Sequence, residues 1–128
     1  MCMEINLTAN EWEIMKIIWA QQPCTLRMIC DEVGKTHSWT RHAVISFLKR
    51  MESKGAIHVE EAEPVKIYTA AIEQETAIRQ ELGSTLARVF DDSPIMMVSY
   101  LAKSNSFTEQ EIEQMIAILK DGDESDDK

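Results

Sequence analysis

The stretch that decides the fold is TRHAVISFLKRMESKG, residues 40–55. Four apolar side chains recur in it at steps of three and four residues: Val44, Phe47, Leu48 and Met51. Because a helix turns through about 100° per residue, these four share one face and predict a core-facing helix that Gly55 ends. The opposite face and its flanks hold a mainly polar and basic set: Arg41, His42, Ile45, Ser46, Lys49 and Arg50.

Two shorter helical patterns precede this stretch. The first begins at a capping box that Thr8 and Glu11 can form, and an apolar stripe follows it. The stripe consists of Trp12, Met15, Ile18 and Trp19, with Ile14 and Ile17 outside it. The second helix begins after Thr25 and ends near Gly34, where a C-cap glycine is favoured. Three short helices with a turn between the second and third predict a helix-turn-helix.

A β-hairpin signal follows the third helix. Apolar and polar residues alternate from Ile57 and again from Val65 to Tyr68, and residues 61–64 form a plausible turn between them. A helix-turn-helix followed by a hairpin is the layout of a winged helix. We therefore expect a mainly α fold with a small β-hairpin wing, and an N-terminal winged-helix domain over residues 1–72.

The residues after the hairpin are predicted to be helical again and to hold two copies of the chain together. Three helices fit residues 73–120, and the middle one is apolar nearly all round. About 50 residues bury too little surface to form a good core alone. We therefore expect a three-helix dimerisation region and a homodimer, with an acidic, disordered tail over residues 121–128. The expected dimer contacts are Leu82, Leu86, Met97, Tyr100, Leu101, Ile112 and Ile116.

Charge is distributed unevenly along the 128 residues. The formal net charge is −9, yet residues 1–72 hold nine acids against eight bases, whereas residues 73–128 hold 13 acids against five bases. Between residues 35 and 54, five bases stand against one acid, Glu52. Such a division of charge between the two halves indicates two functions, one of which is the binding of an anionic partner. On charge alone, a solvated face with incidental bases is the better explanation.

Other features narrow the class of protein. No apolar run approaches the roughly 18 residues of a membrane span, and residues 1–7 lack the basic start of a secretory signal. Three cysteines, an odd number, fit a reducing compartment, so we expect a cytoplasmic protein without membrane contact. The spacing of Cys24, Cys30, His37 and His42 matches no standard metal site. No pattern of a catalytic nucleophile or phosphate loop occurs either, and we expect no metal, cofactor or enzymatic activity.

Three motifs together resemble a known family. The first is LTANEWEIMKIIW at residues 7–19, and the second is WTRH at residues 39–42 leading into LKRMESKG at residues 48–55. The third is Tyr68 at the close of the wing. They resemble the penicillinase-repressor (BlaI/MecI/CopY) family over nearly the whole chain. The resemblance implies a bacterial winged-helix transcriptional repressor that dimerises through its C-terminal helices and occupies a palindromic operator in double-stranded DNA.

The resemblance also makes the basic helix a candidate DNA contact. We expect His42 and Ser46 to donate to base edges, with Arg41 beside them. The side chains better placed for phosphates are Thr40, Lys49 and Arg50, to which Lys66 adds a basic residue of the wing. All seven residues therefore form the expected DNA-binding set.

The wing departs from what related wings offer, because its turn is acidic through Glu60, Glu61 and Glu63. On the recognition helix, Ile45 stands where members often carry a polar or basic residue. These departures leave a second function open, a winged-helix module that binds another protein and little DNA.

The family also suggests how the protein is released from DNA. In the resembled β-lactam-responsive repressors, a sensor and protease pathway cuts the dimerisation helices at an Asn-Phe bond. The corresponding step here is Ser99–Tyr100, which keeps the aromatic residue but lacks the asparagine. We expect loss of dimerisation near this step, through a regulatory protease or another signal, to release DNA. Tyr100 as an ordinary packed aromatic is the alternative.

Overall fold

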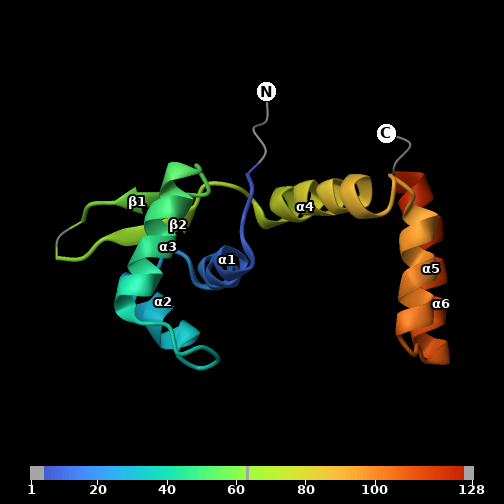
Figure 1. The fold of residues 1–128 in the computed structure, drawn as a ribbon, viewed down its shortest axis with the longest axis horizontal. Coiled ribbons are helices and arrows are strands. Elements are labelled where there is room, and N and C mark those ends of the chain that lie inside the picture. Colours follow the sequence, from blue (N-terminus) through green and yellow to red (C-terminus); the bar gives the residue numbers. More distant parts are fainter. Residues whose placement is uncertain (1–4, 63, 126–128) are drawn as a thin grey trace. The chain divides into compact units, whose positions relative to one another are not determined.

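The computed structural model describes residues 5–62 and 64–125, and the chain forms two compact units, Met1–Ser84 and Thr85–Lys128. The first unit contains, in chain order, α1 (Ala9–Gln21), α2 (Leu26–Val33), α3 (Arg41–Ser53), β1 (Ile57–Glu60) and β2 (Ile67–Ala70) (Figure 1). The division into units falls within α4 (Gln74–Val89), and the second unit continues with α5 (Pro94–Ser104) and α6 (Glu109–Ser125). The expected mainly helical fold with a hairpin wing is confirmed.

Threonine hydroxyls cap the starts of α1, α2 and α3. The predicted capping box is present on α1: the Glu11 amide donates to Thr8 Oγ1 at 3.3 Å, and the Thr8 amide donates to Glu11 Oε1 at 2.9 Å. Thr25 accepts from the Met28 amide at the start of α2. These side chains satisfy amide groups that a helix start leaves without backbone partners.

The buried face of α1 differs from the predicted stripe. Ile14, Met15 and Ile18 are fully buried, whereas Trp12 and Trp19 are half-buried at the edge of the core with their ring centroids 5.7 Å apart. The indole N–H of Trp19 explains its edge position, because it donates to the Ile72 carbonyl oxygen at 2.9 Å. Periodicity identified an apolar face but missed that Ile14 belongs to its centre.

The ends of α2 and α3 use glycine in two different ways. Gly34 is the C-cap of α2, as predicted, and its φ of −65° is a right-handed conformation open to any residue. Gly55 follows α3 with φ +84°, where a side chain would be strained. Gly55 therefore permits the chain to turn sharply from α3 into β1.

The hairpin is anchored to the helices through Tyr68. β1 and β2 pair antiparallel, with Val59 opposite Tyr68. The Tyr68 backbone also exchanges two hydrogen bonds with Cys24, of 2.8 and 3.1 Å, just before α2. β2 begins at Ile67 rather than at the predicted Val65, which lies exposed before the strand. The Cys24 bridge fixes the wing relative to the start of α2.

The core of the first unit lies where α1, α2, α3 and the hairpin meet. The apolar stripe predicted for α3 faces this core, with Val44, Leu48 and Met51 buried and Phe47 packed at its edge. Burial of such side chains is the main favourable contribution to folding, about 1.5–3 kcal/mol for each large one. The polar face of α3 consequently remains outside.

One charged side chain, Glu11, is fully buried at the edge of this core. Its Oε1 lies 2.6 Å from Lys54 Nζ, and the same ammonium donates to the Asn6 carbonyl oxygen. Glu11 Oε2 lies 3.8 Å from Arg50 Nε and has no hydrogen-bond partner among the described residues. Burial by itself raises the pKa of Glu11, but the bonds from Lys54 and Thr8 and the Lys54 charge outweigh it, so the pKa is lowered.

The second unit leaves its apolar side chains largely exposed. No side chain of α5 is buried, and Ile95 is 73% exposed. The apolar surface of this helix, which the sequence predicted to be buried, therefore stays exposed in the single chain. Ser93 caps α5 ahead of Pro94, and the capping box of Thr108 and Glu111 starts α6, both as predicted.

The end of α6 also differs from the expected disordered tail, because the helix continues to Ser125. Adding a residue to an existing helix costs far less than starting one, so the helix extends beyond its apolar stripe. The last three residues of the predicted tail, 126–128, lie outside the described residues. Among the residues that the structure describes, no helix is both long enough and apolar enough to cross a membrane.

Replacing the buried carboxylate tests its contribution to stability. We expect Glu11→Gln to lower the free energy of unfolding by about 1.5–3 kcal/mol at pH 7, as for loss of a charged hydrogen bond. A lowered pKa means that ionised Glu11 stabilises the fold above its ordinary value of 4.5 and loses this effect as pH falls further. The difference between wild type and variant should therefore narrow below pH 4.5 in urea titrations.

The matched control is Glu13→Gln, two residues along on α1, where the carboxylate is 45% exposed and pairs with Lys16 and His37. Exposed pairs contribute little, so this change should cost less than about 1 kcal/mol. Equal losses for the two variants would contradict the assigned role of Glu11.

Candidate nucleic-acid interface

A groove lies between α3 and the wing, and we call it the wing groove. It has a volume of about 440 Å³, and its lining consists of Thr25, Leu26, Arg27, Arg41, Ile45, Pro64, Val65, Lys66 and Tyr68.

Three cationic side chains line the wing groove. Arg27 comes from α2, Arg41 from α3 and Lys66 from the segment before β2, so three elements bring three cations to one groove.

A smaller hollow of about 80 Å³ adjoins the wing groove and shares Ile45, Lys66 and Tyr68 with it. Lys49 and Glu52 of α3 also line this hollow. Arg41, Ile45 and Lys49 follow one another at steps of four residues, so one side of α3 faces the wing along two turns. Burial raises the pKa of Tyr68, whose hydroxyl group lies among charges that include Lys66 and Arg41.

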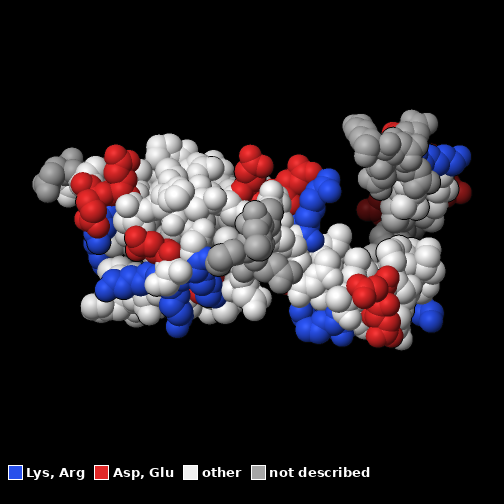
Figure 2. Space-filling model, turned by 90° about the horizontal axis from the view of Figure 1, so that it is seen from above, with Lys and Arg blue, Asp and Glu red and all other residues white. Residues whose placement is uncertain are grey.

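The cations of the wing groove differ in their partners. Within the described residues, no acid lies at ion-pair distance from Arg27, Arg41 or Lys49. Lys66 Nζ lies 3.7 Å from Glu61 Oε2. In Figure 2, lysine and arginine side chains gather along the lower edge of the winged-helix unit, and many of the acidic side chains in view lie along its upper edge. On the face in view, the positive charge of this unit therefore lies mainly along one edge.

The outward face of α3 carries His42 and Ser46, one helical turn apart and both exposed. Neither lines the wing groove. The imidazole and the hydroxyl group can each donate or accept a hydrogen bond, which is the chemistry that reads base edges.

Two of the expected phosphate contacts have partners inside the protein. Thr40 Oγ1 accepts from the Ala43 amide at 3.1 Å and so caps α3. The Arg50 guanidinium lies over the Phe47 ring, 5.2 Å from its centroid, and near Glu11. The expected DNA-binding set is therefore divided in space. Arg41 and Lys66 line the wing groove, Lys49 lines the adjoining hollow, and Arg50 lies near Glu11 of α1.

Sequence reasoning missed Arg27 and the contacts of Glu11 with Arg50 and Lys54. Arg27 is a single basic residue in α2, and only the tertiary fold brings it beside Arg41 and Lys66. Glu11 could be recognised as a helix cap, but its contacts with α3 depend on the packing of α1 against that helix. A search for bases near helix starts could have singled out Arg27, because phosphates bind at such ends.

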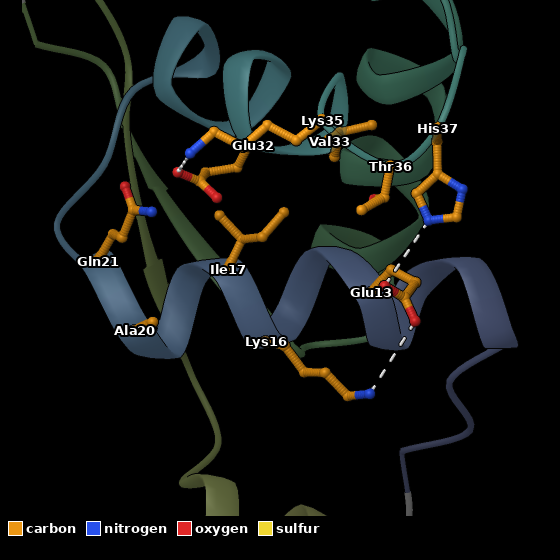
Figure 3. Close-up of a pocket in the computed structure, with 10 residues that line it drawn as sticks. All are labelled: Glu13, Lys16, Ile17, Ala20, Gln21, Glu32, Val33, Lys35, Thr36 and His37. Carbon is orange, nitrogen blue, oxygen red and sulfur yellow. Dashed lines mark hydrogen bonds and ion pairs between the residues drawn. The ribbon is translucent and has the colours of Figure 1, made fainter.

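A separate hollow of about 310 Å³ lies between α1 and the end of α2 (Figure 3). Its charged side chains are paired with one another: Glu13 with Lys16 and His37, and Glu32 with Lys35. Cys24 and Cys30 are free thiols, and burial raises the pKa of both. Within the described residues, no group of three or more His, Cys, Asp or Glu side chains is placed to hold a metal ion.

Three helices, a wing and a basic groove between them define a winged-helix protein. The family model of the penicillinase repressor matches residues 7–121, and the chain belongs to this family. It is 26% identical over 116 residues to the penicillinase repressor of Bacillus licheniformis, covering 91% of each chain. It is 21% identical over 118 residues to the penicillinase repressor of Staphylococcus aureus, covering 92% of this chain and 94% of the relative.

Solved structures resemble the winged-helix unit. The solution structure of the DNA-binding domain of the repressor BlaI matches with a TM-score of 0.52 and 27% identity, covering 58% of this chain and 90% of that chain. The solution structure of the monomeric form of Bacillus licheniformis BlaI, in complex with the blaP half-operator, matches with a TM-score of 0.52 and 27% identity. The match covers 59% of this chain and 92% of that chain. The resemblance inferred from the sequence motifs is confirmed.

The cap of α3 can be tested by substitution. We expect Thr40→Ala to lower the free energy of unfolding by about 1 kcal/mol, because the Ala43 amide loses its acceptor. Thr40→Ser keeps the acceptor and should retain most of the stability. The control is Thr36→Ala, an exposed threonine in the preceding turn, and thermal unfolding of all three gives the measurement. An equal loss from Thr36→Ala would contradict the capping role.

Proposed function

We propose that the protein is a dimeric transcriptional repressor that occupies a palindromic operator in double-stranded DNA. The observation that carries the proposal is the exposed polar face of α3 beside the cations of the wing groove. Membership of the penicillinase repressor family and the likeness to BlaI, whose monomer binds the blaP half-operator, support it. An operator is read in the bacterial cytoplasm, so we propose that location as well.

In the proposed complex, α3 enters the major groove. That groove is about 12 Å wide and admits an α-helix. His42 and Ser46 would then donate to base edges, while Arg41, Lys49 and Lys66 contact the phosphates that pass the wing groove. Arg27 joins this second group because it lies on the same groove. Phosphate contacts set the register, and base contacts set the preference for a sequence.

We propose that residues 73–120 hold the dimer together. Of the expected contacts, Leu82, Tyr100, Leu101, Ile112 and Ile116 are exposed in the single chain, and Leu86 and Met97 are half-buried. Exposed apolar area on this scale favours association with another chain. A two-fold dimer presents two copies of α3 to two half-sites, which accounts for a palindromic operator. A bound dimer represses by excluding the polymerase from the promoter.

Release from DNA is proposed to follow loss of the dimer. Two linked half-site contacts bind far more tightly than one, so separating the copies removes most of the affinity. Ser99 and Tyr100 are exposed in α5. We propose that a regulatory protease or another signal acts near this step. Tyr100 also contacts Phe90 with ring centroids 6.2 Å apart, and this contact favours the alternative of a packing role for Tyr100.

A second candidate function is protein binding through the winged helix with little DNA binding. The net charge of −9 and the exposed acids of the wing, Glu60 and Glu61, favour it. Glu63, the third acid of the predicted wing turn, lies outside the described residues. Salt-dependent duplex binding separates the two functions, because phosphate contacts weaken as salt rises.

Selection from a random duplex pool tests the proposed function, and we expect a palindromic consensus to emerge. Arg41→Ala should weaken binding to every sequence and reduce the salt slope by about one, as for one phosphate contact. Ser46→Ala should instead change the preferred bases, at about 1–3 kcal/mol for each mismatch. Lys16→Ala removes the same charge from α1, away from α3, and serves as the control. Absence of any enriched sequence would favour the protein-binding function.

The dimer can be tested on α6. We expect Ile116→Asp to yield monomers, because a carboxylate cannot be buried unpaired in an apolar contact. The control is Gln114→Asp, which adds the same charge at a polar position of the same helix. Sedimentation gives the mass, and binding to full and half operators gives the affinity. A monomeric wild type at micromolar concentration, or full operator affinity in a monomeric variant, would contradict the proposed dimer mechanism.

A further inference from the structure

The wing presents its charges on two different sides. In the hairpin register, Val59 pairs with Tyr68 and Glu60 pairs with Ile67, so Tyr68 and Glu60 lie on opposite faces. Lys66 lies two residues before Tyr68 and lines the wing groove together with it. The basic side chain of the wing therefore faces α3, and Glu60 is on the other side.

Among the described acids of the wing, Glu61 is the one that lies beside the basic side chain of Lys66. Its Oε2 lies 3.7 Å from Lys66 Nζ, and the two side chains are 75% and 53% exposed. Arg27 and Arg41, on the same groove, have no such partner among the described residues. Lys66 is thus the one groove cation, within the described part of the chain, with a carboxylate at ion-pair distance.

We propose that Glu61 is an internal competitor for DNA phosphate at Lys66, so that it sets the strength and salt dependence of DNA binding rather than the base preference. This inference rests on the proposed function. A phosphate that approaches Lys66 meets a carboxylate already beside the ammonium group. Binding then either displaces Glu61 or holds two anions near one cation, and both lower the affinity.

The size of the effect follows from the exposure of the pair. Exposed ion pairs are weak, so removal of the Glu61 charge should tighten DNA binding by about two- to fivefold at low salt. Lys66 would then contact phosphate without a competitor, and the salt slope should steepen by up to about one. Base preference should stay the same, because neither Glu61 nor Lys66 lies on the outward face of α3 with His42 and Ser46.

The experiment compares Glu61→Gln with Glu60→Gln in the full chain. Both changes remove one negative charge from the wing, but Glu60 lies on the opposite face of the hairpin. Affinity for a duplex selected from the random pool and for an unrelated duplex is measured over a range of salt concentrations. We expect Glu61→Gln to bind both duplexes more tightly by the same factor, and Glu60→Gln to gain less. Thermal unfolding checks that both variants keep the wild-type fold.

A second background isolates Lys66. In Lys66→Ala protein, the further change Glu61→Gln should bring no more gain than Glu60→Gln brings, because the competition no longer has a site. Equal gains from the two glutamine variants, or an undiminished gain without Lys66, would overturn the inference.

Failure of this inference can be distinguished from failure of the proposed function. If wild-type protein binds no duplex, the proposed function fails and this inference fails with it. If wild type binds and Arg41→Ala weakens binding, but Glu61→Gln has no effect, only the competition at Lys66 is wrong.

Discussion

The buried carboxylate of Glu11 is the constraint on which the winged-helix unit depends. Through Oε1 it caps the start of α1 and meets the Lys54 ammonium, which follows the last residue of α3. Because Gly55 then turns the chain into β1, the position of Lys54 also determines where the hairpin begins. Separating Glu11 from Lys54 would leave a buried charge without its partner, which costs free energy. The contact therefore fixes the position of α1 against the end of α3.

The wing groove depends on that frame together with a second anchor. Cys24 pairs with Tyr68 through backbone hydrogen bonds, so the wing and the start of α2 are held together. Arg27 then lies on the same groove as Arg41 and Lys66. Three cations from three elements are placed in this way without a basic run in the sequence.

Local charge, rather than net charge, determines whether a surface of such a protein attracts an anionic partner. The chain carries a net charge of −9, but most of this excess lies after residue 72. Solution ions screen charges over about 8 Å at physiological ionic strength, so an acid acts on the groove only where it lies close to the groove. Among the described residues, Glu52 lines the hollow beside the wing groove, and Glu61 lies at ion-pair distance from Lys66.

The sequence by itself determined the helices, the wing and the family, whereas only the tertiary structure decided which side chains act together. Capping boxes at Thr8 and Thr108 and the stripe of α3 are local patterns, so their structures follow from short-range hydrogen bonds and helical periodicity. Other features depend on contacts between elements that are distant in sequence. These are the full burial of Ile14, the position of Arg41 in the wing groove and the proximity of Arg50 to Glu11. Helical periodicity determines on which face of a helix a side chain lies. Only tertiary packing determines which other residues contact that face.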